Sequence, residues 1–414
     1  MAFRLSSTPA YLVLGSSIVL TTLSACGGGS SSSTAVPSTP APTPLTGVFI
    51  DAPVANINYQ TATQNGTTNA NGEFKYLAGE NVTFSIGSMV LPAAPARARV
   101  SPMDLVNTIS PLDLKAINIA RVLQALDSDG NPANGITIPA SAAAAAPSIA
   151  DFANTAVLDT AFAGAFAGVT MPTSAVAQTH MLNTLGGGVV GTWALTASVA
   201  AAPLVNYAGI HFFPDGTFAY AVFHPALGAG NGSGMEYGTY SFTSTQLTLT
   251  VVTDLNGAAG GISSIANPLT VSYSNVGNNA LITYPGGAID TFTRLPSNTA
   301  GYVGTWKSID PANNGVSMLV LTSTGDVTYV ENDSASPNGL EHGTFTVTGL
   351  SPTADSSGTV TITLTYDDNG PGTGSGIGDI GTPATFPIAI SGNTMTITTN
   401  WPNPGDTINF YRQY

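Results

Sequence analysis

The second half of the chain alternates apolar and polar residues over short runs. The runs "EYGTYSF" (Glu236–Phe242) and "LTLTVVTD" (Leu247–Asp254) are examples, and turns rich in Gly, Asn and Asp separate runs of this kind. Successive side chains of a strand point to opposite faces, so a period of two predicts strands that are buried on one side. From Val189 onward we therefore predict short antiparallel strands and almost no helix.

The β pattern is present twice in the same order. The word "VGTW" occurs at Val190–Trp193 and again at Val303–Trp306, which is 306 − 193 = 113 residues later. The run "EYGTYSF" recurs as "EHGTFTV" (Glu341–Val347), and the two units end at Arg294 and Arg412. Each unit holds roughly eight runs, enough strands to close a small barrel without free edges. The sequence therefore predicts two tandem antiparallel β-barrels, residues 188–297 and 298–414.

Residues 47–187 have a different pattern, which predicts one small α+β module. Strand-like runs fill residues 47–92, and helices are expected within residues 101–186. Ser101 and Ser110 each precede a Pro and are followed three residues later by an Asp, which is typical of helix starts. The second start leads into an apolar helical face that "SDGNPANG" (128–135) ends, and further helices are expected around 148–166 and 173–185. The predicted fold class is mainly β, with the helices of the module covering its small sheet.

Part of the module is similar to known β modules. The stretch "TNANGEFKY" (Thr68–Tyr76) resembles the T-D-x-x-G-x-F turn of transthyretin-type, carboxypeptidase-regulatory-like modules, with Asn69 in place of Asp. The wider stretch Gly47–Leu91 resembles the N-terminal module of many proteobacterial surface lipoproteins.

Each repeat unit resembles the lipocalin/calycin superfamily. Each unit has a G-x-W motif at its expected first strand and an Arg on its expected last strand. In both units the sequence between these residues is long enough for one barrel. The resemblance implies that Arg294 packs over Trp193, and Arg412 over Trp306, and that each pair closes one barrel. The family's disulfides and middle loop motif are absent. Two alternatives remain at this stage, a pair of immunoglobulin-like sandwiches or two halves of one larger barrel.

The N-terminus has the layout of a secretory signal. Arg4 is followed by the apolar run Tyr11–Leu20 and then by "LSAC", which resembles the lipobox of bacterial lipoproteins. The resemblance implies a signal peptide (1–25), a lipidated Cys26 bearing acyl groups such as palmitate, and a membrane anchor. In the family that this motif resembles, a residue other than Asp after the cysteine, here Gly27, implies sorting to the outer membrane. The Gly/Ser/Pro-rich stretch to residue 46 reads as a flexible linker. An ordinary secreted protein with one stray cysteine is the alternative.

Composition excludes several functions. A net charge of −14 from 23 acidic and 9 basic residues leaves no basic patch for nucleic acid. Motifs of serine hydrolases, zinc proteases and phosphate-binding loops are absent, so no catalytic residue is predicted. A secreted hydrolase of unknown type is only the third hypothesis.

Three polar groups remain as candidate sites. Asp127, Asp129 and Asn131 have the i, i+2, i+4 spacing of a calcium loop, or they simply end a helix. Acidic and His residues flank the long loops of both units, where we expect a solvated polar rim rather than a metal or acid–base site; they are His224, Glu236, Glu331, Asp333, Glu341 and His342. His211, beside two phenylalanines, is expected to pack in the barrel wall.

Aromatic residues on the strands can either line a ligand cavity or fill it. The candidates for the lining are Tyr220, Tyr240, Phe242, Tyr273, Tyr329, Phe345 and Phe386. An eight-stranded barrel is wide enough for one small ligand and narrow enough for its own side chains to fill. The leading hypothesis is a non-catalytic outer-membrane lipoprotein that binds a small apolar ligand in one or both barrels. The alternative is a structural or adhesive surface protein with filled barrels and macromolecule-binding loops.

Overall fold

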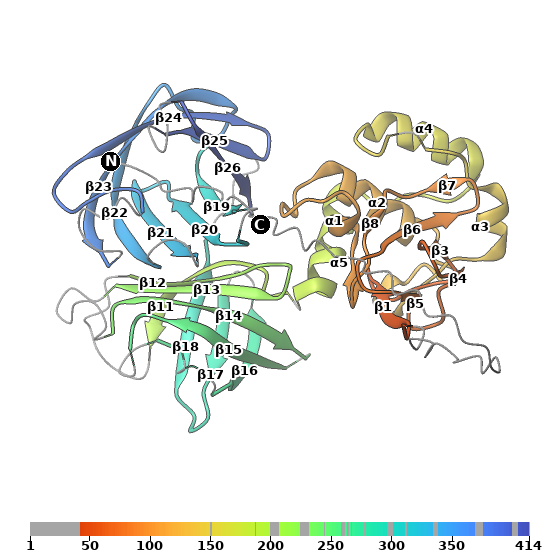
Figure 1. Cartoon of the computed structure of the whole chain (residues 1–414), viewed down its shortest axis with the longest axis horizontal. Coiled ribbons are helices and arrows are strands. Elements are labelled where there is room, and N and C mark those ends of the chain that lie inside the picture. Colours follow the sequence, from red (N-terminus) through yellow and green to blue (C-terminus); the bar gives the residue numbers. More distant parts are fainter. Residues whose placement is uncertain are drawn as a thin grey trace, which may run out of the picture.

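The protein is mainly β, with a small N-terminal module of helices and strands followed by two closed eight-stranded antiparallel barrels (Figure 1). The computed structural model describes residues 42–149, 151–186, 188–198, 207–223, 232–243, 245–257, 261–262, 265, 267–276, 279–295, 301–310, 313–333, 338–368, 376–399 and 405–413. The predicted fold class is confirmed. The sandwich and single-large-barrel alternatives are wrong, because each repeat closes on itself.

The N-terminal module contains three small sheets. Their orders are β5-β1-β9, β4-β3-β6-β7 with β8 on β6, and β10-β2. The strands are β1 (Leu45–Phe49), β2 (Val54–Ala55), β3 (Asn58–Gln60), β4 (Asn65–Thr67), β5 (Glu73–Tyr76), β6 (Asn81–Ile86), β7 (Met89–Val90), β8 (Ala94–Pro95), β9 (Arg99–Val100) and β10 (Ile136–Thr137). Asn69 forms the turn before β5, because its side-chain oxygen accepts hydrogen bonds from the backbone N–H groups of Asn71 and Glu73, both at 3.0 Å.

Five α-helices and one 3-10 turn complete the described part of the module. They are α1 (Pro102–Leu105), α2 (Leu114–Ala125), η1 (Pro132–Asn134), α3 (Ala140–Ala145), α4 (Thr155–Ala165) and α5 (Ser174–Gly186). Ser101 caps α1 in a capping box with Asp104, as its sequence predicts. The second predicted cap is wrong. Asp113 caps α2, and the Ser110 hydroxyl instead donates a hydrogen bond to the carbonyl of Arg412, at 2.7 Å.

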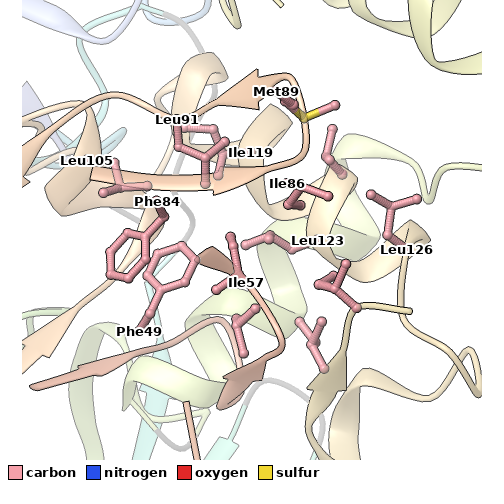
Figure 2. Close-up of a cluster of buried hydrophobic side chains, with 14 of the residues drawn as sticks. Phe49, Ile57, Phe84, Ile86, Met89, Leu91, Leu105, Ile119, Leu123 and Leu126 are labelled. Carbon is pink, nitrogen blue, oxygen red and sulfur yellow. The ribbon is translucent and has the colours of Figure 1, made fainter. Parts of the chain in front are cut away.

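The core of the module lies between its sheets and α2. Figure 2 shows Phe49 and Phe84 stacked, with ring centroids 4.1 Å apart, beside Ile119 and Leu123 of the helix. These four side chains are fully buried, so the helix supplies the apolar cover that sheets this small need.

The two barrels have the same strand order and the same irregularity. Barrel 1 consists of β11 (Gly191–Ser198), β12 (Tyr207–Phe212), β13 (Thr217–Phe223), β14 (Gly234–Phe242), β15 (Gln246–Asp254), β16 (Leu269–Val276), β17 (Asn279–Thr283) and β18 (Ile289–Arg294). Barrel 2 consists of β19 (Gly304–Ile309), β20 (Val316–Leu321), β21 (Asp326–Asn332), β22 (Gly339–Thr348), β23 (Ser356–Asp367), β24 (Ala384–Ser391), β25 (Thr394–Thr398) and β26 (Thr407–Arg412). A register shift follows Tyr237 in one barrel and His342 in the other, at matching positions.

The barrels pack against each other through equivalent surfaces. Thr192 and Thr305, the threonines of the two "VGTW" words, approach each other with their hydroxyl oxygens 2.5 Å apart. An apolar cluster joins the outer faces of both barrels and contains Phe213, Ala219, Ala221, Met235, Met318, Val320, Val330, Leu340 and Tyr366. Equivalent residues meet each other in this way across the two-fold axis of a symmetric dimer, so the repeats are arranged like a covalently joined dimer.

The N-terminal module contacts barrel 2 through the loop between α1 and α2. Besides the bond from Ser110, the Asn393 side chain donates a hydrogen bond to the carbonyl of Leu112, at 2.8 Å. Both bonds fix the loop near the end of the last strand of the chain. Among the described residues, no helix combines the length and the apolar character that crossing a membrane would need.

Candidate functional site

One end of each barrel is closed by a tryptophan–arginine pair. The guanidinium carbon of Arg294 lies 4.2 Å from the centre of the Trp193 ring, and that of Arg412 lies 4.1 Å from the Trp306 ring. Each pair also occupies neighbouring positions of the first and last strands of its barrel. The structure therefore brings together the residues that the lipocalin resemblance pairs.

The hydrogen bonds of the two closures are also alike. Arg294 donates to the carbonyls of Gly188 and Val190, and Arg412 donates to those of Gly301 and Val303, the equivalent residues 113 positions later. Burial lowers the pKa of Arg412 to about 10, which leaves its guanidinium charged at neutral pH. Each closure is therefore a charged, hydrogen-bonded lid over an apolar ring.

The opposite end of each barrel is held by a buried glutamate. Glu236 accepts the backbone N–H of Ile262 at 2.9 Å, and Glu341 accepts that of Ile377 at 2.7 Å. The solvated rim expected for these residues is wrong, since both glutamates are fully buried on the inward-facing side of their strands. Both isoleucines belong to the apolar interior of their barrels. The glutamates thus anchor loops that help to fill the barrels.

The interior of barrel 1 is filled by its own side chains. The predicted lining residues Tyr220, Tyr240, Phe242 and Tyr273 all belong to its apolar cluster. The space left beside Trp193 measures about 10 Å³, which is room for one water molecule at most. Tyr240 has its hydroxyl committed to the carbonyl of Phe213, at 2.8 Å. The space beside Trp193 is thus too small for a small organic ligand.

Barrel 2 differs from barrel 1 at the seam between its first and last strands. In barrel 1 the seam is paired along β11 from Trp193 to Ser198. In barrel 2 the pairing of β19 with β26 stops after Lys307 and Tyr411. The remainder of β19, from Ser308 onward, has no strand partner on that side among the described residues.

A cleft of about 790 Å³ opens where β19 and β26 separate. Its walls come from both strands, its floor from the inner face of β20 and β21, and its cover from the α1–α2 loop of the N-terminal module. The residues that line it are Asn107, Thr108, Ile109, Ser308, Ile309, Asp310, Ser317, Tyr329, Glu331, Asp333 and Thr407–Tyr411. Pockets for small molecules in proteins measure about 300–1,000 Å³, so the cleft has the size of a ligand site.

Glu331 is the most unusual residue of the cleft. It is only 7% exposed, and one of its carboxylate oxygens, Oε2, has no hydrogen-bond partner among the described residues. Burial, and next the charge of Asp333, raises the pKa of Glu331 to about 7. The backbone of Gly376 and the neighbouring Tyr329 side chain partly offset this rise. The Tyr329 hydroxyl donates its hydrogen to Ser317, at 3.1 Å. The predicted solvated rim is wrong for Glu331 as well.

The residues that line the cleft of barrel 2 differ from their equivalents in barrel 1. The strand registers place Leu195, Ala208 and Val222 of barrel 1 at the positions of Ser308, Ser317 and Glu331 in barrel 2. Barrel 1 is thus apolar where barrel 2 is polar. The aligned repeats therefore contain a signal for the cleft, at the positions where their polarity differs.

The other aromatic candidates of barrel 2, Phe345 and Phe386, pack in its apolar interior. His211 is fully buried in the barrel wall, as predicted, and its ring nitrogen Nδ1 lies 2.6 Å from the Thr192 hydroxyl. Burial, with the nearby charge of Lys307, lowers the pKa of His211 to about 3, so the ring is neutral at physiological pH. None of these three residues lines the cleft.

The predicted calcium loop uses its side chains locally. Asp127 accepts a hydrogen bond from the backbone N–H of Thr137 at 2.9 Å. One oxygen of Asp129 accepts from the backbone N–H of Asn131, and the other accepts from the Asn134 side chain, both at 2.9 Å. Calcium at this loop stays a prediction. Across the described part of the chain, no three His, Cys, Asp or Glu residues cluster as a metal site. Cys26 and His224 lie outside the described residues.

A second hollow, of about 490 Å³, lies between the N-terminal module and both barrels. Two of the three cations that line it are already paired, Arg97 with Asp104 at 3.1 Å and Lys307 with Asp215 at 2.8 Å. Its charges are therefore largely satisfied within the protein, unlike Glu331 of the cleft.

Comparison with known proteins adds no family. The chain matches no protein-family model, and no curated protein matches it.

Proposed function

We propose that the protein is a cell-envelope lipoprotein that binds one small molecule per chain in the cleft of barrel 2. The observation that carries this proposal is the contrast between the repeats. The barrel 2 cleft measures about 790 Å³ and reaches inward-facing residues, whereas the space beside Trp193 in barrel 1 measures about 10 Å³. The small-molecule site expected in one or both barrels is thus assigned to the cleft between β19 and β26 of barrel 2.

Barrel 1 has a structural role in this proposal. Its filled interior and the apolar interface with barrel 2 support a rigid platform that holds β20 and β21, the floor of the cleft, in place. The filled-barrel alternative from the sequence is therefore retained for this repeat alone.

The envelope location rests on the N-terminal sequence. The lipobox-like "LSAC" and the Gly/Ser/Pro-rich linker up to residue 46 support a lipid anchor on Cys26 and a tether to the outer membrane. A tethered binding protein keeps its ligand close to the membrane surface.

Substitutions that copy barrel 1 into barrel 2 test the binding proposal. The triple variant Ser308→Leu, Ser317→Ala, Glu331→Val places barrel 1 residues at equivalent strand positions, where barrel 1 shows that such a wall closes. Native mass spectrometry and fluorescence with the neutral dye N-phenyl-1-naphthylamine measure stoichiometry and affinity on the full chain. We expect one dye per chain in the wild type and none in the triple variant.

The matched control is Leu195→Ser, the reverse change in barrel 1, which is expected to leave dye binding intact. Binding that survives the triple substitution, or absence of dye binding in the wild type, contradicts the proposal. Circular dichroism of all variants shows whether each remains folded.

A further inference from the structure

We propose that the cleft of barrel 2 selects an organic cation, a primary amine carried on an apolar or aromatic body. The inference rests on the proposed binding function and adds the chemical class of the ligand.

The charge of the lining is of one sign. Asp310, Glu331 and Asp333 line the cleft, and among the described lining residues there is no Lys, Arg or His. A concave site with carboxylates and low-dielectric walls concentrates cations and excludes anions. The chain as a whole carries a net charge of −14, which adds to this preference.

Glu331 supplies the specific contact. A buried carboxylate oxygen without a donor is costly, because it has lost its water and gained no partner. The Oε2 atom of Glu331 is in this position among the described residues, and its side chain lines the floor of the cleft. An ammonium group carries three N–H donors and one positive charge, so it satisfies both needs of that oxygen. A neutral alcohol supplies the hydrogen bond but not the charge.

The remaining lining suits an apolar body. Tyr329, Phe410 and Tyr411 border the cleft, and Ile309 and Ile408 add aliphatic surface. Aromatic rings hold a nearby cation through their electron-rich faces and bury the carbon skeleton that carries it. Ser317 already accepts the Tyr329 hydroxyl, which fixes that ring at the floor.

Amine binding on this account strengthens as pH rises through about 7. The titratable groups that face Glu331 are Tyr329 on its own strand, Asp333 just after that strand and Glu341 on β22, and no described basic group lines the cleft beside them. Glu331 is mostly neutral below this pH and mostly ionised above it, whereas an aliphatic amine stays charged. The affinity for an amine is therefore expected to rise about tenfold between pH 6 and pH 8.

Three indole probes of nearly equal shape test the inference on the full chain by calorimetry. Tryptamine carries a positive charge, tryptophol none, and indole-3-propionate a negative charge. At pH 8 we expect tryptamine to bind about tenfold or more tightly than tryptophol, and the propionate most weakly. Glu331→Gln is expected to remove the tryptamine advantage and its pH dependence, while tryptophol affinity changes less than about threefold.

Glu73→Gln removes one carboxylate that does not line the cleft and serves as the charge control, with unchanged preference for tryptamine expected. Asp333→Asn is the second test variant and is expected to weaken tryptamine less than Glu331→Gln does. If tryptophol or N-phenyl-1-naphthylamine binds in the cleft but tryptamine is not preferred, the amine inference is overturned and the proposed function stands. If no probe or dye binds, both are overturned.

Discussion

Trp306→Ala removes the largest part of the closure of barrel 2. The Trp306 ring is fully buried and lies under the Arg412 guanidinium, and its Nε1 donates to the carbonyl of Tyr302 at 3.0 Å. Replacing a buried aromatic ring by Ala costs about 3–5 kcal/mol, because apolar contact is lost and a cavity remains. Loss of the cation–π contact falls within this range, since Arg412 keeps its bonds to the carbonyls of Gly301 and Val303. For a domain of this size the expected fall in Tm is roughly 10–20 °C.

Urea denaturation followed by circular dichroism measures this loss on the full chain. Trp306→Phe, which keeps a ring under Arg412, is the control and is expected to lose clearly less stability. A double-mutant cycle with Arg412→Met gives the coupling between ring and guanidinium, expected to be about 1 kcal/mol. A loss below about 1 kcal/mol for Trp306→Ala, with the unfolding transition otherwise unchanged, refutes the closure argument.

Three further predictions concern the bond between Glu341 and Ile377, the ionisation of Glu331 and the lipidation of Cys26. Glu341→Ala leaves the Ile377 N–H without its acceptor, so hydrogen exchange at this amide is expected to accelerate about tenfold or more. Glu341→Gln keeps an acceptor and is expected to restore protection. Equal exchange rates in the wild type and both variants contradict the role of Glu341 in holding this loop. Folding favours the neutral form of Glu331, since its pKa rises from 4.5 to about 7 in the folded state. Protonated Glu331 therefore contributes to the free energy of unfolding below about pH 4.5, and this contribution is lost as the pH rises to about 7. The loss is on the order of 3 kcal/mol. The difference in unfolding free energy between wild type and Glu331→Gln should therefore change between pH 5 and pH 8, and a constant difference excludes the shift. Cys26→Ser is expected to abolish labelling by radioactive palmitate and to release the protein from the membrane fraction, whereas retained label places the lipid elsewhere.

The repeats made most of the fold predictable. Eight period-two runs bounded by the Gly-Thr-Trp word and a final Arg define each barrel, and the structure closes both as eight-stranded barrels. One of the two predicted helix caps was wrong, because a tertiary contact replaced the local capping bond. Ser101 caps its helix, while the equivalent-looking Ser110 hydrogen-bonds to Arg412, 302 residues away.

The candidate cleft was harder to predict than the fold. A period-two pattern gives the face of a residue but not the extent of strand pairing, so it did not predict the early separation of β19 and β26. The polarity of Glu331 suggested an exposed rim, since glutamates are rarely buried without a partner. The alignment of Ser308, Ser317 and Glu331 with Leu195, Ala208 and Val222 was the available signal that barrel 2 departs from barrel 1.

A crystal structure of the full chain with N-phenyl-1-naphthylamine shows where the small molecule lies. We expect dye density in the cleft between β19 and β26, beside Tyr329 and Glu331, and none inside barrel 1. Density inside barrel 1, or an empty cleft at saturating dye, contradicts this expectation.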